Sequence, residues 1–298
     1  MLLEEISQKL AAGERLDLGE IDAVAQADNL LALGALADER RRQLHGSQTT
    51  FVRVYEIEAS STASSQLEIP PGAGEVRIVG EVEHGDRALS ATRNVVSVCA
   101  GLPVTGFALD DLAGLCRWDR PALTDLLGKL KQAGLSLLAE ARADRMRGPD
   151  WFEAAGAVGL GIGRITVGEA TNDLGVDLVR RVVAWGPALE PVHAFAPLPL
   201  TSGSQPTTGF EDIRQVALAR VLVDNVDSIQ VDWRKYGPKL AQVALSFGAN
   251  DIDRVSPLDT LDLGWRRAPL EELTRNVRAC ALVPVERNGR FENLEANR

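Results

Sequence analysis

The sequence predicts an α/β protein built as a TIM-type (β/α)8 barrel with an N-terminal helical extension. From residue 50 onward, short β-branched and apolar runs alternate with helical segments. Repeated β–α units of this kind form a parallel sheet with right-handed crossovers. Eight units within 298 residues favour a closed barrel. No G-x-G-x-x-G turn follows the first strand, which disfavours an open dinucleotide-binding sheet.

Periodicity and turn residues place the individual elements. Residues 1 to about 45 have helical spacing that ends at the basic run 40–42 before Gly46. Strands are expected at residues 51–58, 75–80, 104–109, 135–140, 164–168, 192–200, 228–233 and 251–255. Helices are expected at residues 88–100, 119–133, 149–159, 173–185, 211–223, 238–247 and 269–281. The glycine-rich stretch 159–163 is interpreted as a tight turn between a helix and a strand.

The connection between the first two strands is irregular. Residues 59–74 are rich in Ser, Pro and Gly and are too few for an ordinary crossover helix. We therefore expect the first crossover helix to be missing, which leaves a gap that another element of the chain, a second copy or a protein partner could cover. The chain is expected to be one domain, with an extension (1–48), the barrel (49–283) and a C-terminal tail (284–298).

Composition excludes several classes of protein. A net charge of −10 disfavours nucleic-acid binding and docking to anionic membranes. No apolar run approaches the roughly 20 residues that span a bilayer, and the N-terminus does not resemble a signal peptide. The three dispersed cysteines, Cys99, Cys116 and Cys280, indicate reduced thiols and a cytoplasmic location.

Several segments resemble the aminofutalosine synthase-like radical-SAM family of the futalosine route to menaquinone. The similar segments are 33–38, 42–46, 237–245, 247–251 and 283–287. The resemblance extends over nearly the whole chain, and these segments belong mainly to the framework. It implies a barrel fold and an ancestry in S-adenosylmethionine chemistry.

The residues that carry the family's chemistry are missing. The family binds a [4Fe–4S] cluster through a C-x-x-x-C-x-x-C loop after the first strand, whereas residues 60–65 read Ser-Ser-Thr-Ala-Ser-Ser. Serine hydroxyls are poor substitutes for thiolate ligands. Later motifs are altered as well, because one glycine before Glu81 is lost, His84 is shifted, and a Gly-His pair becomes Gly168-Glu169. We therefore expect neither a [4Fe–4S] cluster nor bound S-adenosylmethionine.

Polar side chains near the predicted strand ends are the candidate site residues, because barrel enzymes place their sites at the C-terminal ends of the strands. The candidates are Glu56, Glu81, His84, Glu140, Arg142, Glu169, Asp232, Arg234, Asn250 and Asp251. Glu58, Asn172, Lys235 and Asp253 lie beside them in the sequence.

Three interpretations of this acidic mouth remain open. The first is a solvated rim whose carboxylates pair with Arg142, Arg234 and Lys235. The second is a pocket for a nucleoside or carboxylate, in which Arg234 or Lys235 holds the anion and Asp232 or Asn250 the hydroxyl groups. The third interpretation is a divalent metal site. Its ligands would be Glu56, Glu81 and Glu169, with His84 as a further candidate.

The leading functional hypothesis is a catalytically degenerate homologue of aminofutalosine synthase. It would act as a binding or partner subunit linked to menaquinone biosynthesis. The alternative is a non-radical lyase or hydrolase that acts on a futalosine-like nucleoside in the retained barrel pocket. The sequence leaves enzymatic activity itself undecided.

Overall fold

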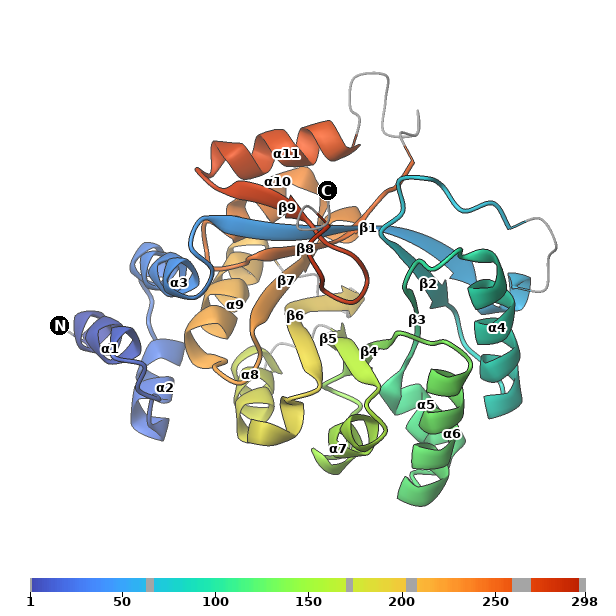
Figure 1. Ribbon diagram of the computed structural model, residues 1–298. Coiled ribbons are helices and arrows are strands. Elements are labelled where there is room, and N and C mark those ends of the chain that lie inside the picture. Colours follow the sequence, from blue (N-terminus) through green and yellow to red (C-terminus); the bar gives the residue numbers. More distant parts are fainter. Residues whose placement is uncertain (1, 63–66, 170–173, 202–207, 259–268, 295–298) are drawn as a thin grey trace.

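The computed structural model describes residues 2–62, 67–169, 174–201, 208–258 and 269–294 (Figure 1). Eight parallel strands close into a barrel, because β1 pairs with β8 at one edge and with β2 at the other. The strands are β1 (Gln48–Glu58), β2 (Glu75–Val79), β3 (Val104–Ala108), β4 (Leu137–Arg142), β5 (Gly161–Glu169), β6 (Val192–Thr201), β7 (Ser228–Asp232) and β8 (Asp251–Val255). The predicted fold class is confirmed, with all eight strands at their expected places.

Helices surround this barrel (Figure 1). They are α4 (Gly85–Val98), α5 (Leu109–Leu115), α6 (Arg120–Gln132), α7 (Asp150–Ala157), α8 (Leu174–Ala184), α9 (Gly209–Leu222), α10 (Trp233–Leu245) and α11 (Pro269–Ala279). Helix α5 was not predicted; it is a short helix that follows β3 without a loop. Helix α10 begins at Trp233, five residues before the expected start at Pro238, and has a kink at Gly237.

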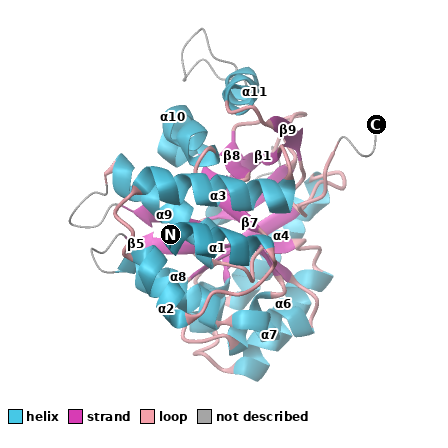
Figure 2. Ribbon diagram, turned by 90° about the vertical axis from the view of Figure 1, so that its left-hand side faces the viewer, coloured by secondary structure: helices cyan, strands magenta, loops and turns pink. Residues whose placement is uncertain are grey.

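The N-terminal extension consists of α1 (Leu2–Ala11), α2 (Leu18–Ala25) and α3 (Leu30–His45). Helix α3 packs along α9, so the extension covers one side of the barrel (Figure 2). Gly34 permits α3 to approach the residues that follow α10, because a Cβ atom there would lie 2.3 Å from the ring of Phe247. No helix among the described residues is long and apolar enough to cross a membrane.

The first crossover differs from the others, as the sequence predicted. In the described residues between β1 and β2, the regular structure is a single 3-10 turn, Ala59–Ser61. At the expected gap, the outward-facing Ile57, Val76 and Ile78 are buried. Leu67 and Ile69 of the connection pack against the apolar core. The chain therefore covers this part of its own barrel.

The C-terminal residues form more structure than the predicted tail. A ninth strand, β9 (Val283–Glu286), pairs in parallel with the first half of β1. Beyond it, Arg287 pairs with Asn293 in an antiparallel bridge, so the chain turns back on itself. This C-terminal loop (287–293) lies at the N-terminal ends of the barrel strands, which we call the base of the barrel. The opposite end is called the mouth.

Candidate functional site

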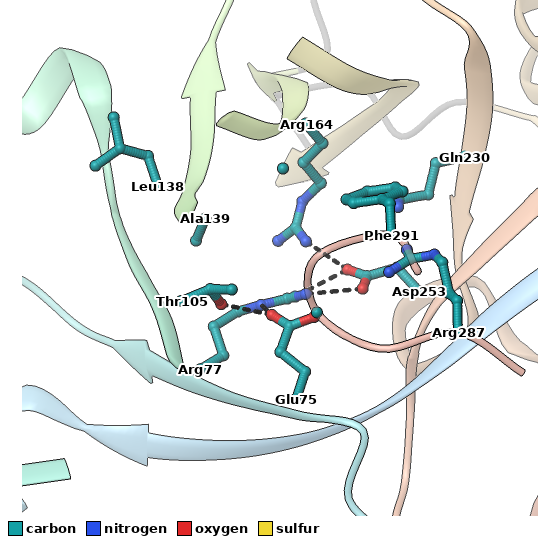
Figure 3. A pocket seen from close by; sticks show the side chains of 12 residues that line it. Glu75, Arg77, Thr105, Leu138, Ala139, Arg164, Gln230, Asp253, Arg287 and Phe291 are labelled. Atoms are coloured by element: carbon teal, nitrogen blue, oxygen red, sulfur yellow. Dashed lines mark hydrogen bonds and ion pairs between the residues drawn. The ribbon is translucent and has the colours of Figure 1, made fainter. Parts of the chain in front are cut away.

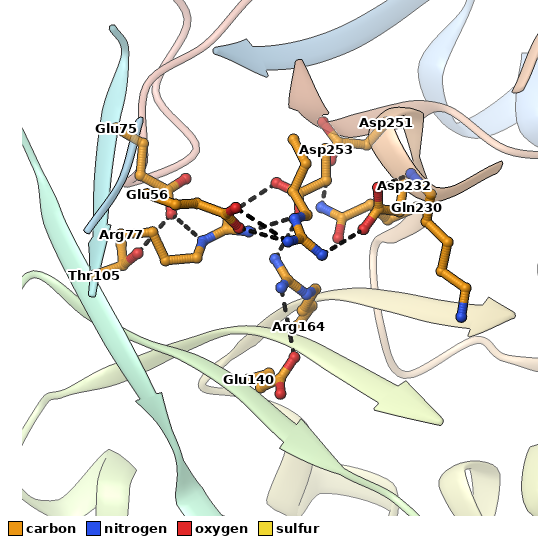
Figure 4. A network of polar contacts seen from close by, with 12 residues as sticks. Glu56, Glu75, Arg77, Thr105, Glu140, Arg164, Gln230, Asp232, Asp251 and Asp253 are labelled. Carbon is orange, nitrogen blue, oxygen red and sulfur yellow. Dashed lines mark hydrogen bonds and ion pairs between the residues drawn. The ribbon is translucent and has the colours of Figure 1, made fainter. Parts of the chain in front are cut away.

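Charged side chains fill the middle of the barrel, where many barrels have apolar layers. Asp253 of β8 accepts two hydrogen bonds of 2.8 Å from Arg77 of β2 and one of 2.5 Å from Arg164 of β5. Glu75 of β2 accepts from Arg77 at 2.7 Å. We call these four residues the ionic core (Figure 4).

The ionic core is almost closed to solvent. The side chains of Glu75 and Asp253 are each 3% exposed. Burial alone would raise the pKa of Asp253, but the Arg164 and Arg77 guanidinium groups outweigh it and hold that pKa well below its usual range. Burial of Arg77 is likewise outweighed by Asp253 and Glu75, which raise its pKa well above the ordinary value. Arg77 and Asp253 are therefore both charged near neutral pH.

A small cavity lies against the ionic core (Figure 3). It has a volume of about 10 Å³, which is room for roughly one water molecule. Gln230 lines it and is 2% exposed, and its Oε1 has no hydrogen-bond partner among the described residues. A nucleoside does not fit in a space of this size.

The base of the barrel is closed by the C-terminal loop. Arg287 donates to both carboxylate oxygens of Asp251, each at 2.7 Å. The ring of Phe291 lies 3.7 Å from the Arg287 guanidinium (Figure 3). It also stacks on His193, with the ring centroids 4.6 Å apart. Burial and the nearby Arg287 lower the pKa of His193, so this histidine is neutral at pH 7. It is a packing residue beneath the loop.

The mouth contains a second set of ion pairs. Glu56 of β1 contacts Arg254 at 2.8 Å and accepts a hydrogen bond of 2.6 Å from Arg234. Asp232 of β7 accepts from Arg254 at 3.2 Å. Glu56 and Asp232 point toward each other in Figure 4. The mouth of the described barrel is thus bridged by Arg254.

Two more predicted residues take part in ion pairs above the ionic core. Glu140 of β4 accepts from Arg164 at 3.4 Å. Arg142, the last residue of β4, donates to Asp110 at 2.7 Å and also contacts Asp111. For these residues, and for Glu56, Asp232 and Arg234, the geometry agrees with the predicted rim of paired charges.

The predicted placement of Asn250 and Asp251 is wrong. Asn250 precedes β8 and Asp251 is its first residue, so both lie at the base. Asn250 Oδ1 accepts from the backbone N–H of Ile229 at 2.8 Å and from Arg220. The sequence analysis found the strand but assigned these residues to its wrong end.

The remaining candidates do not meet at the mouth in the described part of the chain. Glu81 is exposed. His84 is the N-cap of α4, and its Nδ1 accepts from the backbone N–H of Arg87 at 3.2 Å. Glu169 ends β5, but its side chain lies outside the described residues. Among described residues, no group of three or more His, Cys, Asp or Glu is arranged to hold a metal ion.

The loop after β1 contains no cysteine. Its described residues are Ala, Ser and Thr, and the carbonyls of Ala59 and Ser60 accept hydrogen bonds from Arg87. All three cysteines follow the ends of helices, Cys99 after α4, Cys116 after α5 and Cys280 after α11. In β–α units such as those of α4 and α11, the helix C-terminus leads back to the base. Cys99 and Cys280 therefore lie away from this loop.

The burial of the Cys99 side chain can be tested directly. Its burial raises the pKa of the thiol to about 11. Because the thiolate is the reactive form, alkylation of Cys99 at pH 8 is expected to be on the order of a hundredfold slower than for a free cysteine. Mass spectrometry after iodoacetamide treatment would check this, with half-exposed Cys280 as the internal control. Equal labelling of the two thiols in folded protein would contradict the buried position.

Comparison with known proteins agrees with the resemblance seen in the sequence. Residues 200–257 match the family model of the CofH/MqnC C-terminal region. A 5-amino-6-(D-ribitylamino)uracil–L-tyrosine 4-hydroxyphenyl transferase of Methanosphaerula palustris is 26% identical over 84% of this chain and 85% of its own. The aminodeoxyfutalosine synthase of Streptomyces coelicolor is 35% identical over 32% of this chain and 26% of its own length. The chain is similar to both enzymes.

Solved structures support the fold. Methylornithine synthase (PylB) superposes with a TM-score of 0.66 at 14% identity, covering 94% of this chain and 97% of its own. The FeFe-hydrogenase maturase HydG of Carboxydothermus hydrogenoformans gives a TM-score of 0.63 at 15% identity, covering 95% and 79%. For some relatives the chain covers a much smaller share of the relative's own length. It matches 27% of the length of a Methanosarcina mazei transferase. Activity and substrates are therefore not carried over from these matches.

Proposed function

We propose that this chain is a catalytically degenerate homologue of aminofutalosine synthase that serves as a binding or partner subunit. The observation that carries the proposal is the loop after β1, where Ser and Thr stand in place of thiolate ligands. Hard, protonated hydroxyl groups hold iron–sulfur clusters poorly. The link to menaquinone biosynthesis rests on the similarity to the named synthase.

The contacts at the mouth add independent support. Glu56 and Asp232 both bind Arg254, so they are not free to serve as a general acid or base. The cavity in the middle of the barrel has a volume of only about 10 Å³. No observation on the described residues favours the alternative, a non-radical lyase or hydrolase acting on a futalosine-like nucleoside in the retained barrel pocket.

Anaerobic reconstitution with iron and sulfide tests the proposal. We expect no iron to remain after gel filtration, no visible iron–sulfur absorbance, and no 5′-deoxyadenosine from S-adenosylmethionine under reducing conditions. The Streptomyces coelicolor synthase, treated in parallel, is the positive control for the reconstitution. Stoichiometric iron together with 5′-deoxyadenosine formation would overturn the proposal, whatever the substrate.

A partner role predicts a second observable. Native purification of the tagged chain should recover a bound protein or a discrete homo-oligomer at a fixed ratio. Multi-angle light scattering measures the mass of the particle. A monomer at all concentrations, with nothing bound, would leave only the ligand-binding form of the proposal.

A further inference from the structure

The side-chain amide of Gln230 has a fixed orientation inside the barrel. Its Nε2 donates a hydrogen bond of 2.6 Å to Asp251 Oδ2, and this bond would be lost if the amide were turned over. Oε1 is therefore the amide atom left for the cavity that Gln230 lines. It has no hydrogen-bond partner among the described residues, although Gln230 is only 2% exposed. Buried acceptors of this kind are normally satisfied by protein or by an ordered water molecule.

The cavity beside Gln230 is small, and its walls are mostly polar. Its volume is about 10 Å³, which suits roughly one water molecule. The wall includes three guanidinium groups and two carboxyl groups, from Arg77, Arg164, Arg287, Glu75 and Asp253 (Figure 3). Cavities that stay dry in proteins are lined by apolar side chains, whereas polar cavities of sufficient size hold water. Volume and lining therefore both fit a bound water molecule.

The charges around Gln230 Oε1 favour a neutral ligand that donates a hydrogen bond. Oε1 can only accept, so an anion such as chloride would face it without a hydrogen bond. A small cation such as ammonium could donate, but it would lie beside the positively charged groups of Arg77 and Arg164, which repel it. Water meets both conditions, because it is neutral and both donates and accepts hydrogen bonds.

Arg164 of β5 can supply the second contact. Its guanidinium donates to Asp253 at 2.5 Å and to Glu140 at 3.4 Å, and further N–H groups have no acceptor among the described residues. We propose that one water molecule is bound in this cavity, donates a hydrogen bond to Gln230 Oε1 and accepts one from Arg164. This water would connect β5 to β7 and complete the hydrogen bonding beside the ionic core.

The C-terminal loop encloses the water site from the base of the barrel. Arg287, Gly289 and Phe291 of this loop all line the cavity. Exchange of the bound water with solvent is expected to require local opening of the loop, so the water should stay far longer than a surface water. The inference goes beyond the proposed binding or partner role and does not depend on it, because it concerns the interior of the barrel.

A high-resolution crystal structure of the full chain tests the inference directly. We expect one ordered water within about 2.7–3.2 Å of Gln230 Oε1, with a second contact to a nitrogen of Arg164. Well-ordered side chains around the cavity, with no density peak between them, would overturn the inference. A peak toward which Gln230 turns its Nε2 would also overturn it, because the bound species would then be an acceptor such as chloride.

Oxygen-17 relaxation dispersion of the solvent tests the same site in solution, because it detects slowly exchanging internal waters. Gln230→Met removes the acceptor at similar side-chain length, and we expect the loss of one such water relative to the wild type. Thr50→Val is the matched control. Thr50 is the other neutral donor to Asp251, at 2.5 Å, but it is not among the described residues that line the cavity. The control should therefore keep the water.

The same number of slowly exchanging waters in the wild type and in Gln230→Met would contradict the inference. The crystal structure of the wild type needs no substitution, so the water site is tested even if Gln230→Met does not fold. The iron reconstitution assay tests the proposed function separately, and the two results are therefore distinguishable.

Discussion

Asp253→Asn is expected to lower the free energy of unfolding by about 3–5 kcal/mol, the usual result when one partner of a buried ion pair is removed. The carboxylate neutralises both Arg77 and Arg164, and asparagine leaves these guanidinium groups with too little negative charge beside them. Arg77 keeps Glu75, but Arg164 keeps only the longer contact to Glu140. Urea denaturation of the wild type and the variant, followed by circular dichroism, measures the difference.

Asp125→Asn is the matched control for this substitution. Asp125 also has a cationic partner, Lys129 at 2.6 Å, but the two side chains are 64% and 54% exposed. Solvent-screened pairs of this kind contribute little, so almost no change in stability is expected. If the two variants lost similar amounts of unfolding free energy, solvent would screen the charges of the ionic core as strongly as it screens ion pairs on the surface.

The effect of Asp253 also depends on pH. The folded-state pKa of Asp253 lies below the ordinary value, which is about 3.9 in an unfolded chain. The unfolded state therefore binds the proton first, and the stabilisation is complete above pH 4 and is lost as the pH falls below it. The stability difference between wild type and Asp253→Asn should thus shrink in acid. A difference that stays constant from pH 7 to pH 3 would contradict this assignment.

The barrel could be predicted because its signals are local. The alternation of apolar strands with amphipathic helices is visible within a single β–α unit. Helix α6 is an example of such a local signal. Asp119 caps its N-terminus and Leu123, Leu126, Leu127 and Leu130 form one buried face. The lack of an ordinary crossover helix after β1 could be predicted from an equally local signal, because the stretch between β1 and β2 is rich in turn-forming residues.

The site was harder to predict, because its contacts join residues far apart in the sequence. Arg77 and Asp253 are separated by 176 positions, and no local pattern shows that two charged residues in different strands face the same interior. A weak signal was present in β2, where Glu75 and Arg77 alternate with the apolar Val76 and Ile78. Arg254 could not be predicted, because a bulge breaks the alternation from which side-chain direction is inferred.

The C-terminal loop supplies the second large effect that we expect. Arg287 is 2% exposed and Asp251 is completely buried, and the two form a bidentate pair at the base. Burial would lower the pKa of Arg287, but Asp251 outweighs it and raises that pKa. Arg287→Ala removes the cation and leaves Asp251, among the described residues, with the neutral donors Gln230 and Thr50. The expected loss is about 3–5 kcal/mol of unfolding free energy.

Chemical denaturation of Arg287→Ala, compared with Arg290→Ala, measures this effect. Arg290 lies in the same loop but is exposed, so its loss should change stability little.

The double variant Arg287→Ala/Asp251→Asn separates the ion pair from the packing of the loop. If the buried charge is the main cost, the second substitution recovers part of the stability, because it removes the unpaired carboxylate. If the packing of Phe291 on Arg287 and His193 dominates, the double variant stays as unstable as Arg287→Ala or becomes less stable. The C-terminal loop would then act as an apolar cover for the base, and its ion pair would contribute specificity without net stability.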